Sequence, residues 1–448
     1  MTAFLLATLC CALGGSTRDG QQILAECGFQ GGLVVQVGCG NADPLLGLAQ
    51  TPNALVHGLV SDPERVEAVR HGIRHARIYG RVSVMAWQGP FLPYADGMVN
   101  VLLSLDERVT LAPAEIDRVL APYGIAWLQR NGKLTAHRKA PPADVDEWSH
   151  SRYDATGNAV SKDKRVGPPR FLQWEGLPRW NRGVKTSSMV STHGRLFFIL
   201  DDSAFDSDIR TWSLIARDAY NGIQLWRREL SAWPGAKGGK KVGPAQVHRR
   251  LVASGDRVYA TLADPGPVSV LNAADGQLLR TLSETEPAEE MILSAGILVA
   301  LVNPNTAADL RRGAGQNMRL VAVDPDSGKT LWKHPAALIM PLTLAADGKQ
   351  VVYHDGKAIV SLDLRTGAHR WTSTPTGQKI AYHDQANSDR PGAEPSTIVL
   401  APQFAPTLIL YGDVVAFAGG RRLVVVSAAN GTERSEEHTS ELQSRGLI

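Results

Sequence analysis

Short apolar runs alternate with amphipathic, helix-like segments through the first 140 residues. The run LVVQV at 33–37 ends in a Gly-Cys-Gly turn, and a helix-like stretch follows it. Pro63 suits the first turn of a helix over 63–76. Strand and helix in turn predict an α/β Rossmann-like domain with a parallel, doubly wound sheet. The expected strands are 33–37, 54–62, 81–87, 98–105 and 125–130, and the expected helices are 63–76 and 113–124.

From about residue 165 the pattern changes to strand-like runs that are separated by turn residues. The runs are rich in β-branched and aromatic residues, and no helical period lies between them. This pattern predicts an all-β unit. Its clearest runs lie at 195–200, 257–262, 297–302, 350–354 and 414–426.

One motif recurs within the all-β unit. Residues 216–226, 321–332 and 361–371 each contain an Asp, a Gly four positions later, and a Trp four positions after the Gly. The Gly supplies the positive φ of a hairpin turn. Weaker copies occur at 273–280 and 425–431. Copies that recur roughly every 40–60 residues predict the blades of a β-propeller, each a small four-stranded sheet.

The motif A-x-D-x-x-x-G-x-x-x-W resembles the repeat of the pyrroloquinoline-quinone (PQQ)-like propellers, over about residues 165–431. That superfamily includes quinoprotein alcohol dehydrogenases and also BamB-like propellers, which serve outer-membrane protein assembly and bind no cofactor. The resemblance implies that Trp226, Trp332 and Trp371 pack between neighbouring blades. It also implies protein partners at the propeller loops and blade edges, and an association with the outer membrane.

The N-terminal unit resembles the class I S-adenosylmethionine (SAM)-dependent methyltransferases over about residues 20–136. LPYADGMVNVLL (92–103) and EIDRVLAPYGIAWL (115–128) look like the fourth-strand and fifth-strand segments of that family. The resemblance implies that the glycine-rich turn approaches the methionine part of SAM, and that the acidic residue after the second strand binds the ribose. The matching cofactor-binding residues are Gly38, Cys39, Gly40 and Asp62.

Several positions depart from the methyltransferase pattern. Gln36 replaces the acidic residue of the first strand, Ala42 replaces the third glycine, and MAWQGPF (85–91) lacks the aspartate that would hold adenine. No Asn-Pro-Pro-Tyr-type catalytic motif is found, and neither are the antiparallel strands that close the fold. Each lost charge-assisted hydrogen bond removes about 1.5–3 kcal/mol of binding. We therefore expect a degenerate domain with no catalytic residue and no cofactor.

Two enzymatic alternatives stay open. The first is an active SAM-dependent methyltransferase whose propeller recruits the substrate. The second is a quinoprotein oxidoreductase, a class that holds PQQ beneath a disulfide of adjacent cysteines, with calcium and a catalytic Asp nearby. The adjacent cysteines in this chain are Cys10 and Cys11, and residues 40–448 contain no cysteine. We therefore expect neither PQQ nor a metal site.

The net charge and the N-terminal segment indicate which ligands and which cellular location to expect. The chain has 47 Lys and Arg against 44 Asp and Glu, a net charge of +3, and no long basic stripe, so nucleic-acid binding is not expected. The first 19 residues hold an apolar run of about eleven residues, the length of a signal-peptide core and too short to span a bilayer. A periplasmic or otherwise exported protein is therefore expected. The oligomeric state stays open.

These patterns divide the chain into five segments. RSEEHTSELQS at 434–444 matches the translation of a widely used sequencing adapter, so we interpret this tail as a translated artefact that the fold prediction does not cover, and we expect the propeller to be incomplete. The expected segments are a signal segment (1–19), the methyltransferase-like domain (20–139), a linker (140–170), propeller blades (171–433) and the adapter-derived tail (434–448).

The linker contains a cluster of acidic residues and a histidine. Asp146, Glu147, His150 and Asp154 are close in sequence, but their offsets fit no standard set of metal ligands. We therefore expect a hydrogen-bonded segment that docks onto the first blade.

Overall fold

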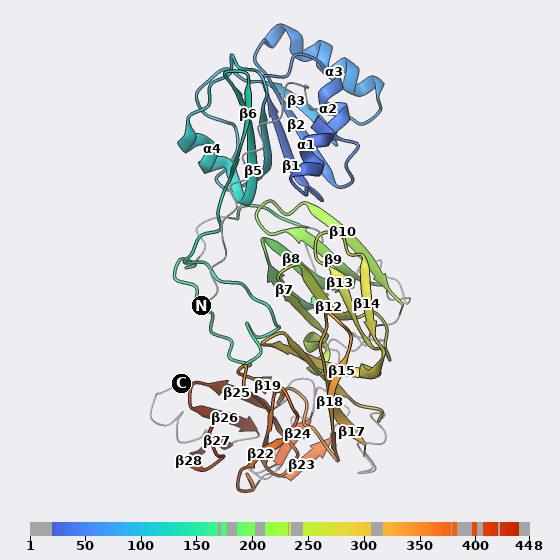
Figure 1. The fold of residues 1–448 in the computed structure, drawn as a ribbon, viewed down its shortest axis with the longest axis vertical. Coiled ribbons are helices and arrows are strands. Elements are labelled where there is room, and N and C mark those ends of the chain that lie inside the picture. Colours follow the sequence, from blue (N-terminus) through green and yellow to red (C-terminus); the bar gives the residue numbers. More distant parts are fainter. Residues whose placement is uncertain are drawn as a thin grey trace. The chain divides into compact units, whose positions relative to one another are not determined.

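The computed structural model describes most of the chain between residues 20 and 438. Contacts between residues divide the protein into two compact units, Met1–Lys139 and Ala140–Ile448 (Figure 1). The expected signal segment (1–19) and residues 439–448 of the expected tail lie outside the described residues. The described ranges are 20–168, 172–176, 186–201, 211–231, 233, 245–305, 317–377, 379–382, 397–400, 406–419 and 422–438.

The first unit is built on a six-stranded sheet with the order β3-β2-β1-β4-β5-β6. The first five strands in this order run parallel, which confirms the predicted doubly wound sheet. The sixth strand runs antiparallel to β5. The strands are β1 (Gly32–Val37), β2 (Ala54–Val60), β3 (Val82–Ala86), β4 (Val99–Ser104), β5 (Leu120–Arg130) and β6 (Lys133–Arg138).

Strand β6 corrects the expectation that no antiparallel strand closes this sheet. It follows β5 through Asn131 and Gly132, whose φ angles are +51° and +72°. An Asn-Gly pair with two positive φ values makes the tight turn that suits the twist of a two-residue hairpin. The strand itself was hard to recognise because nearly all its side chains are exposed.

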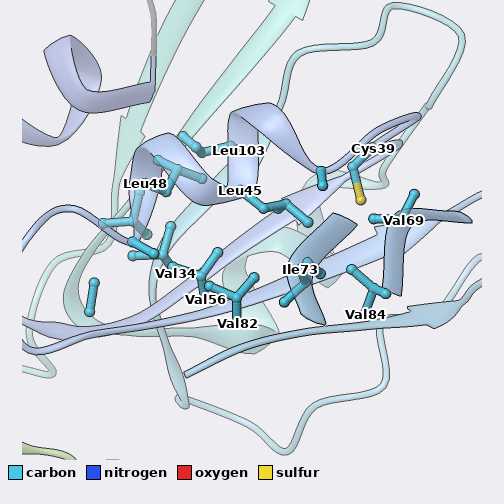
Figure 2. Close-up of a cluster of buried hydrophobic side chains, with 14 of the residues drawn as sticks. Val34, Cys39, Leu45, Leu48, Val56, Val69, Ile73, Val82, Val84 and Leu103 are labelled. Carbon is cyan, nitrogen blue, oxygen red and sulfur yellow. The ribbon is translucent and has the colours of Figure 1, made fainter. Parts of the chain in front are cut away.

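Helices cover the faces of this sheet. They are α1 (Gly20–Glu26), α2 (Asp43–Leu48), the short η1 (Pro63–Arg65), α3 (Val66–His75) and α4 (Pro113–Val119). The expected helix 113–124 ends early because Pro122 disfavours helical geometry at the residue before it, and Leu120 is already extended. Figure 2 shows Leu45 of α2 and Ile73 of α3 packed with Val34 and Val56 of the sheet. No described helix is long and apolar enough to cross a membrane.

The second unit consists of antiparallel sheets in chain order. Its described residues form five four-stranded sheets, β7–β10, β11–β14, β15–β18, β19–β22 and β25–β28, and one parallel pair, β23-β24. Within each four-stranded sheet, neighbours in space are neighbours in sequence, as expected for propeller blades. The bounds of the first ten strands are β7 (Thr186–Thr192), β8 (Arg195–Asp201), β9 (Trp212–Asp218), β10 (Gln224–Leu230), β11 (Leu251–Ser254), β12 (Arg257–Thr261), β13 (Val268–Asn272), β14 (Leu278–Leu282), β15 (Ala288–Ser294) and β16 (Ile297–Val302). The remaining strands are β17 (Met318–Val323), β18 (Thr330–Ala336), β19 (Ala345–Ala346), β20 (Gln350–His354), β21 (Ile359–Asp363), β22 (His369–Thr372), β23 (Lys379–Tyr382), β24 (Thr397–Leu400), β25 (Thr407–Tyr411), β26 (Val414–Gly419), β27 (Arg422–Ser427) and β28 (Glu433–His438).

The tryptophan of the repeated motif joins the first sheet to the second, the third to the fourth and the fourth to the fifth. The Trp226 indole of the first sheet donates a hydrogen bond to the carbonyl of Ala273 in the second sheet at 3.0 Å. Its ring covers Gly276, where a Cβ would lie 2.7 Å from the indole. This confirms that the repeat tryptophans pack between blades. Trp332 and Trp371 make the same bonds to Leu364 and Ala428.

One repeat tryptophan was missed by the sequence analysis. Trp174, which precedes the first sheet, donates to the carbonyl of Ala219 at 3.0 Å and covers Gly222. Asp163 and Gly167 keep the Asp-to-Gly spacing of the repeat, and Asp163 accepts the N–H groups of Arg165 and Val166 as the repeat aspartates do, but Trp174 lies seven positions after Gly167 instead of four, so the spacing did not reveal it.

Part of the segment that we interpret as adapter-derived forms a strand. Strand β28 includes residues 434–438 and pairs antiparallel with β27, from Arg422↔His438 to Val426↔Glu433. An outermost strand needs backbone hydrogen bonds and a correct turn more than an apolar pattern. Gly431, with φ of +73°, provides that turn.

Candidate functional site

The expected cofactor site lies where β1 and β2 end at the carboxyl edge of the parallel sheet. Gly38 follows β1 with φ of +78°. A Cβ at this position would lie 2.9 Å from Cγ2 of Val109 and 3.1 Å from Cβ of Asp106. Glycine is therefore required both by the backbone conformation and by the close approach of the loop after β4.

Cys39 points into the core. Its side chain is 3% exposed and its thiol donates to the Leu59 carbonyl at 3.3 Å. Burial raises the pKa of this thiol to about 11, so it stays protonated. Figure 2 shows the sulfur among the apolar residues of the first unit. The side chain therefore contributes packing, and only the backbone of Cys39 could meet a ligand.

The backbone of this turn is also bonded within the chain. The Leu59 carbonyl accepts the N–H groups of both Gly38 and Cys39, at 2.9 and 3.2 Å. These bonds fix the turn after β1 against the end of β2. They also use N–H groups that a ligand would otherwise attract.

The side chain of Arg65 lies beside both Asp62 and Gly40. One oxygen of Asp62 accepts the Glu64 N–H at 3.1 Å, and the other lies 3.4 Å from Nε of Arg65. A Cβ at Gly40 would lie 3.4 Å from Nη1 of the same arginine. Arg65 therefore lies beside both Asp62 and the glycine turn, and a ribose would have to compete with it for the carboxylate.

Asp106 is a further acidic residue at this edge that the sequence analysis missed. It follows β4 and binds Arg108 through both oxygens, at 2.9 and 2.8 Å. These hydrogen bonds from Arg108 lower the pKa of Asp106 below its usual value. Its position directly after the apolar run 98–105 was the available signal. Both acidic groups at this edge are thus paired with arginines of the chain.

A second region of interest is the strap, which we define as residues 146–157 of the linker. The strap binds the first strand of every four-stranded sheet in the described part of the second unit, and it meets the five sheets in chain order. The bonds are Ser191 N–H to Trp148 O (2.7 Å), Ala253 N–H to Ser149 O (2.9 Å), Leu293 N–H to His150 Nε2 (3.0 Å), Ala346 N–H to Ala155 O (2.8 Å) and Leu410 N–H to Thr156 O (2.9 Å).

The bonds to β7 confirm the expectation that the linker docks onto the first blade, and the strap also reaches the four sheets that follow. Its carboxylates bind groups of the chain itself. Glu147 accepts the Thr192 hydroxyl and the His193 N–H, at 2.9 and 2.7 Å. Asp146 accepts the Tyr153 hydroxyl, and Asp154 accepts the N–H of Thr156. The acidic cluster therefore shapes the strap.

Buried charges lie beneath the strap. The side chains of Arg249 and Glu290 are 5% and 0% exposed, and their closest N and O atoms are 3.5 Å apart. The other oxygen of Glu290 accepts the Leu342 N–H at 2.6 Å. Burial raises the pKa of Glu290 to about 7 and lowers the pKa of Arg249. The pair thus joins Glu290 of β15 to the segments that lead into β11 and β19, three strands that the strap also connects.

Solved structures resemble each unit at low identity. BamB from Moraxella catarrhalis is 13% identical, with 56% of this chain and 73% of that chain covered and a TM-score of 0.32. A putative SAM-dependent methyltransferase from Methanococcus maripaludis is 18% identical, with 25% and 54% covered and a TM-score of 0.23. A SAM-dependent methyltransferase from Aquifex aeolicus is 19% identical, with 27% and 68% covered and a TM-score of 0.22.

The chain thus spans about half the length of the first of these methyltransferases. No curated protein sequence matches the chain. The fold assignment of the first unit therefore depends on its own strand order and register, described above.

A family model described as outer membrane protein assembly factor BamB matches residues 152–337 and 210–393. The two matches overlap and include the strap residues from Arg152 onward together with the first four described four-stranded sheets. Together they span more than half of the 448 residues. The chain therefore belongs to the BamB family of PQQ-like β-propellers.

Proposed function

We propose that the protein is an exported binding and scaffold protein whose α/β domain keeps a methyltransferase-like fold without methyl transfer. Partner proteins bind at the loops and blade edges of the propeller, in the periplasm and in association with the outer membrane. The description of the matched family, an outer membrane protein assembly factor, supports this role. No SAM, PQQ or metal takes part.

The observation that carries the proposal is the set of internal bonds at the expected SAM site. The N–H groups of Gly38 and Cys39 share the Leu59 carbonyl, and Asp62 is engaged by Glu64 and Arg65. A ligand would have to compete with these contacts. The Asp62–Arg65 pair is more than half exposed, so displacing it costs a ligand no more than about 1 kcal/mol, whereas the bonds to Leu59 tie the turn to the sheet.

One observation favours the alternative of an active SAM-dependent methyltransferase. Gly38, Gly40 and Asp62 follow two adjacent parallel strands, β1 and β2, whose carboxyl ends share one edge of the sheet. Ligands of doubly wound sheets bind at this edge. The propeller would then recruit the substrate.

Calorimetric titration of the full chain with SAM, and with its demethylated product, separates the two functions. We expect no heat of binding at millimolar ligand. Low-micromolar binding that is lost in Asp62→Ala, and kept in the control Asp117→Ala, would establish the alternative. Asp117 suits the control because it lies on α4 and its side chain is 58% exposed.

The scaffold role has its own test in cells. A photo-crosslinking residue placed at Asp326, whose side chain is 80% exposed in a repeat turn, should capture proteins of the cell envelope. Cell fractionation should recover the protein in the periplasm. Recovery in the cytoplasm with no envelope crosslink would contradict the proposal.

A further inference from the structure

A groove of about 430 Å³ runs beside the first strand of the first propeller sheet. It is lined by Trp148 and Ser151 of the strap, by the six consecutive residues Thr186–Ser191 of β7, and by Leu196 and His248. Alternate side chains of a strand point to opposite faces of a sheet. Six consecutive residues therefore indicate that the groove follows the free edge of β7 instead of one face.

The register of β7 shows which backbone groups face this edge. Among the described residues β7 pairs with β8 alone, and Thr192 is opposite Arg195 across a two-residue turn. The flanking pair of such a turn exchanges backbone bonds, so Thr192 and Val190 face β8 while Ser191 and Met189 face the free edge. The Ser191 N–H confirms this direction, because it donates to the Trp148 carbonyl at 2.7 Å.

The strap uses only the end of this edge. After Trp148 it turns away from β7, since the next carbonyl, of Ser149, accepts the N–H of Ala253 on β11. Met189, two positions before Ser191, lines the groove and is 48% exposed. Trp148 thus pairs with the edge of β7 at Ser191, and the groove lies along the same edge at Met189.

The walls of the groove indicate the chemistry of its occupant. Trp148, Met189 and Leu196 provide apolar surface, and the serines provide small hydroxyl groups. Burial lowers the pKa of His248 to about 4, so its ring is neutral at physiological pH. No Asp, Glu, Lys or Arg is among the described lining residues, which disfavours a charged ligand.

We propose that an extended, uncharged segment of a partner protein adds as a strand to the free edge of β7, with an apolar side chain against Trp148 and Met189. Strand addition gives affinity through main-chain hydrogen bonds and specificity through pockets for alternate side chains. This proposal rests on the proposed scaffold function and assigns one binding site to it.

Selection of displayed random peptides against the full chain provides the probe. We expect uncharged peptides rich in β-branched and apolar residues, each of which then serves as the defined ligand. Methylating the backbone nitrogens of a selected peptide one at a time should lower affinity at least tenfold at alternate positions only, because one side of a strand pairs with the edge.

Variants of the groove complete the test. Met189→Pro removes the N–H that faces the peptide and spares the bonds to β8, so affinity should fall at least tenfold, whereas the control Met189→Leu should bind normally. Three results would each overturn the proposal of strand addition at β7. They are equal binding by wild type and Met189→Pro, a methylation effect that does not alternate along the peptide, and failure to select any peptide. The crosslinking and SAM experiments would still decide the scaffold function separately.

Discussion

His150 accepts the Leu293 N–H through Nε2 at 3.0 Å, which ties the strap to β15 across 143 positions of sequence. Burial lowers the pKa of His150 to about 3, so the ring is neutral and its acceptor nitrogen stays available. The other ring nitrogen lies 2.8 Å from the Ser149 hydroxyl. A neutral imidazole thus connects the strap to the third sheet.

Replacing His150 by alanine should destabilise the protein by about 1–3 kcal/mol, because the Leu293 N–H loses its partner. Urea unfolding measures the loss, as a lower midpoint with an unchanged slope. His137→Ala is the matched control, since that ring is 51% exposed, and it should change stability by less than about 0.5 kcal/mol. Equal effects of the two substitutions would refute the role of His150.

The His150 bond should also make stability depend on pH. An unfolded histidine titrates near 6.5 and folded His150 near 3, so the unfolded chain binds more protons between these values. Stability should fall as pH drops below about 6.5, by about 1.4 kcal/mol per pH unit for this residue.

Glu290 contributes with the opposite sign, because its raised pKa favours the folded state at low pH. The comparison of wild type with His150→Asn isolates the histidine. Their difference in stability should be constant above pH 7 and should shrink below about pH 6. A difference that does not change with pH would rule out His150 as the titrating group.

Trp226→Phe should destabilise the contact between the first and second sheets by about 1–3 kcal/mol, because the carbonyl of Ala273 loses its donor. Trp226→Ala should cost about 3–5 kcal/mol, since it also removes the buried ring. Thermal unfolding would measure both losses. If Phe were tolerated as well as Trp, the indole hydrogen bond would contribute nothing.

The second sheet lacks the repeat tryptophan, and Arg280 packs against Gly328 of the third sheet in its place. Arg280→Trp should restore the missing contact and stabilise the protein by about 0.5–2 kcal/mol, the usual gain of a consensus substitution. Leu279→Trp, one position away, is the control, because its side chain points to the other face of β14. A stabilisation by both variants, or by neither, would contradict the repeat geometry.

Removing one member of the buried pair Arg249–Glu290 should be costly. Arg249→Met removes the cation that favours the ionised form of Glu290, so this carboxyl should take up a proton, and the Leu344 carbonyl loses its donor; about 1–3 kcal/mol of stability should be lost. The double variant Arg249→Met, Glu290→Leu should recover much of this loss, because well-packed apolar residues often replace a buried pair at little cost. A double-mutant cycle from urea unfolding gives the coupling. Strictly additive losses would show that the two charges do not interact.

Local signals predicted much of the fold. Pro63 marked the start of the helical segment after β2, and the repeat Asp and Gly marked the hairpin turns of the second unit. Such signals depend on φ angles and hydrogen bonds within a few residues, so one sequence contains them. The same reasoning failed where the local pattern was weak, as in the exposed strand β6.

The candidate sites were harder to predict because their contacts are distant in sequence. Nothing near Cys39 shows that its thiol turns inward to Leu59, and nothing near Asp106 shows that the loop after β4 closes on Gly38. The strap residues were noticed as a cluster, but their partners are backbone groups of five separate sheets. Because any residue has a backbone N–H or carbonyl, backbone partners cannot be recognised from the residue types in the sequence.

The order in which the strap meets the sheets has a consequence for folding. A chain of repeats that touch only their neighbours can lose its units one at a time from either end. Here one segment, the strap, precedes the five four-stranded sheets in the sequence and binds the first strand of each. Its last bond accepts the N–H of Leu410. The repeats should therefore unfold in one concerted transition, and a destabilising substitution in one blade should lower the stability of the others.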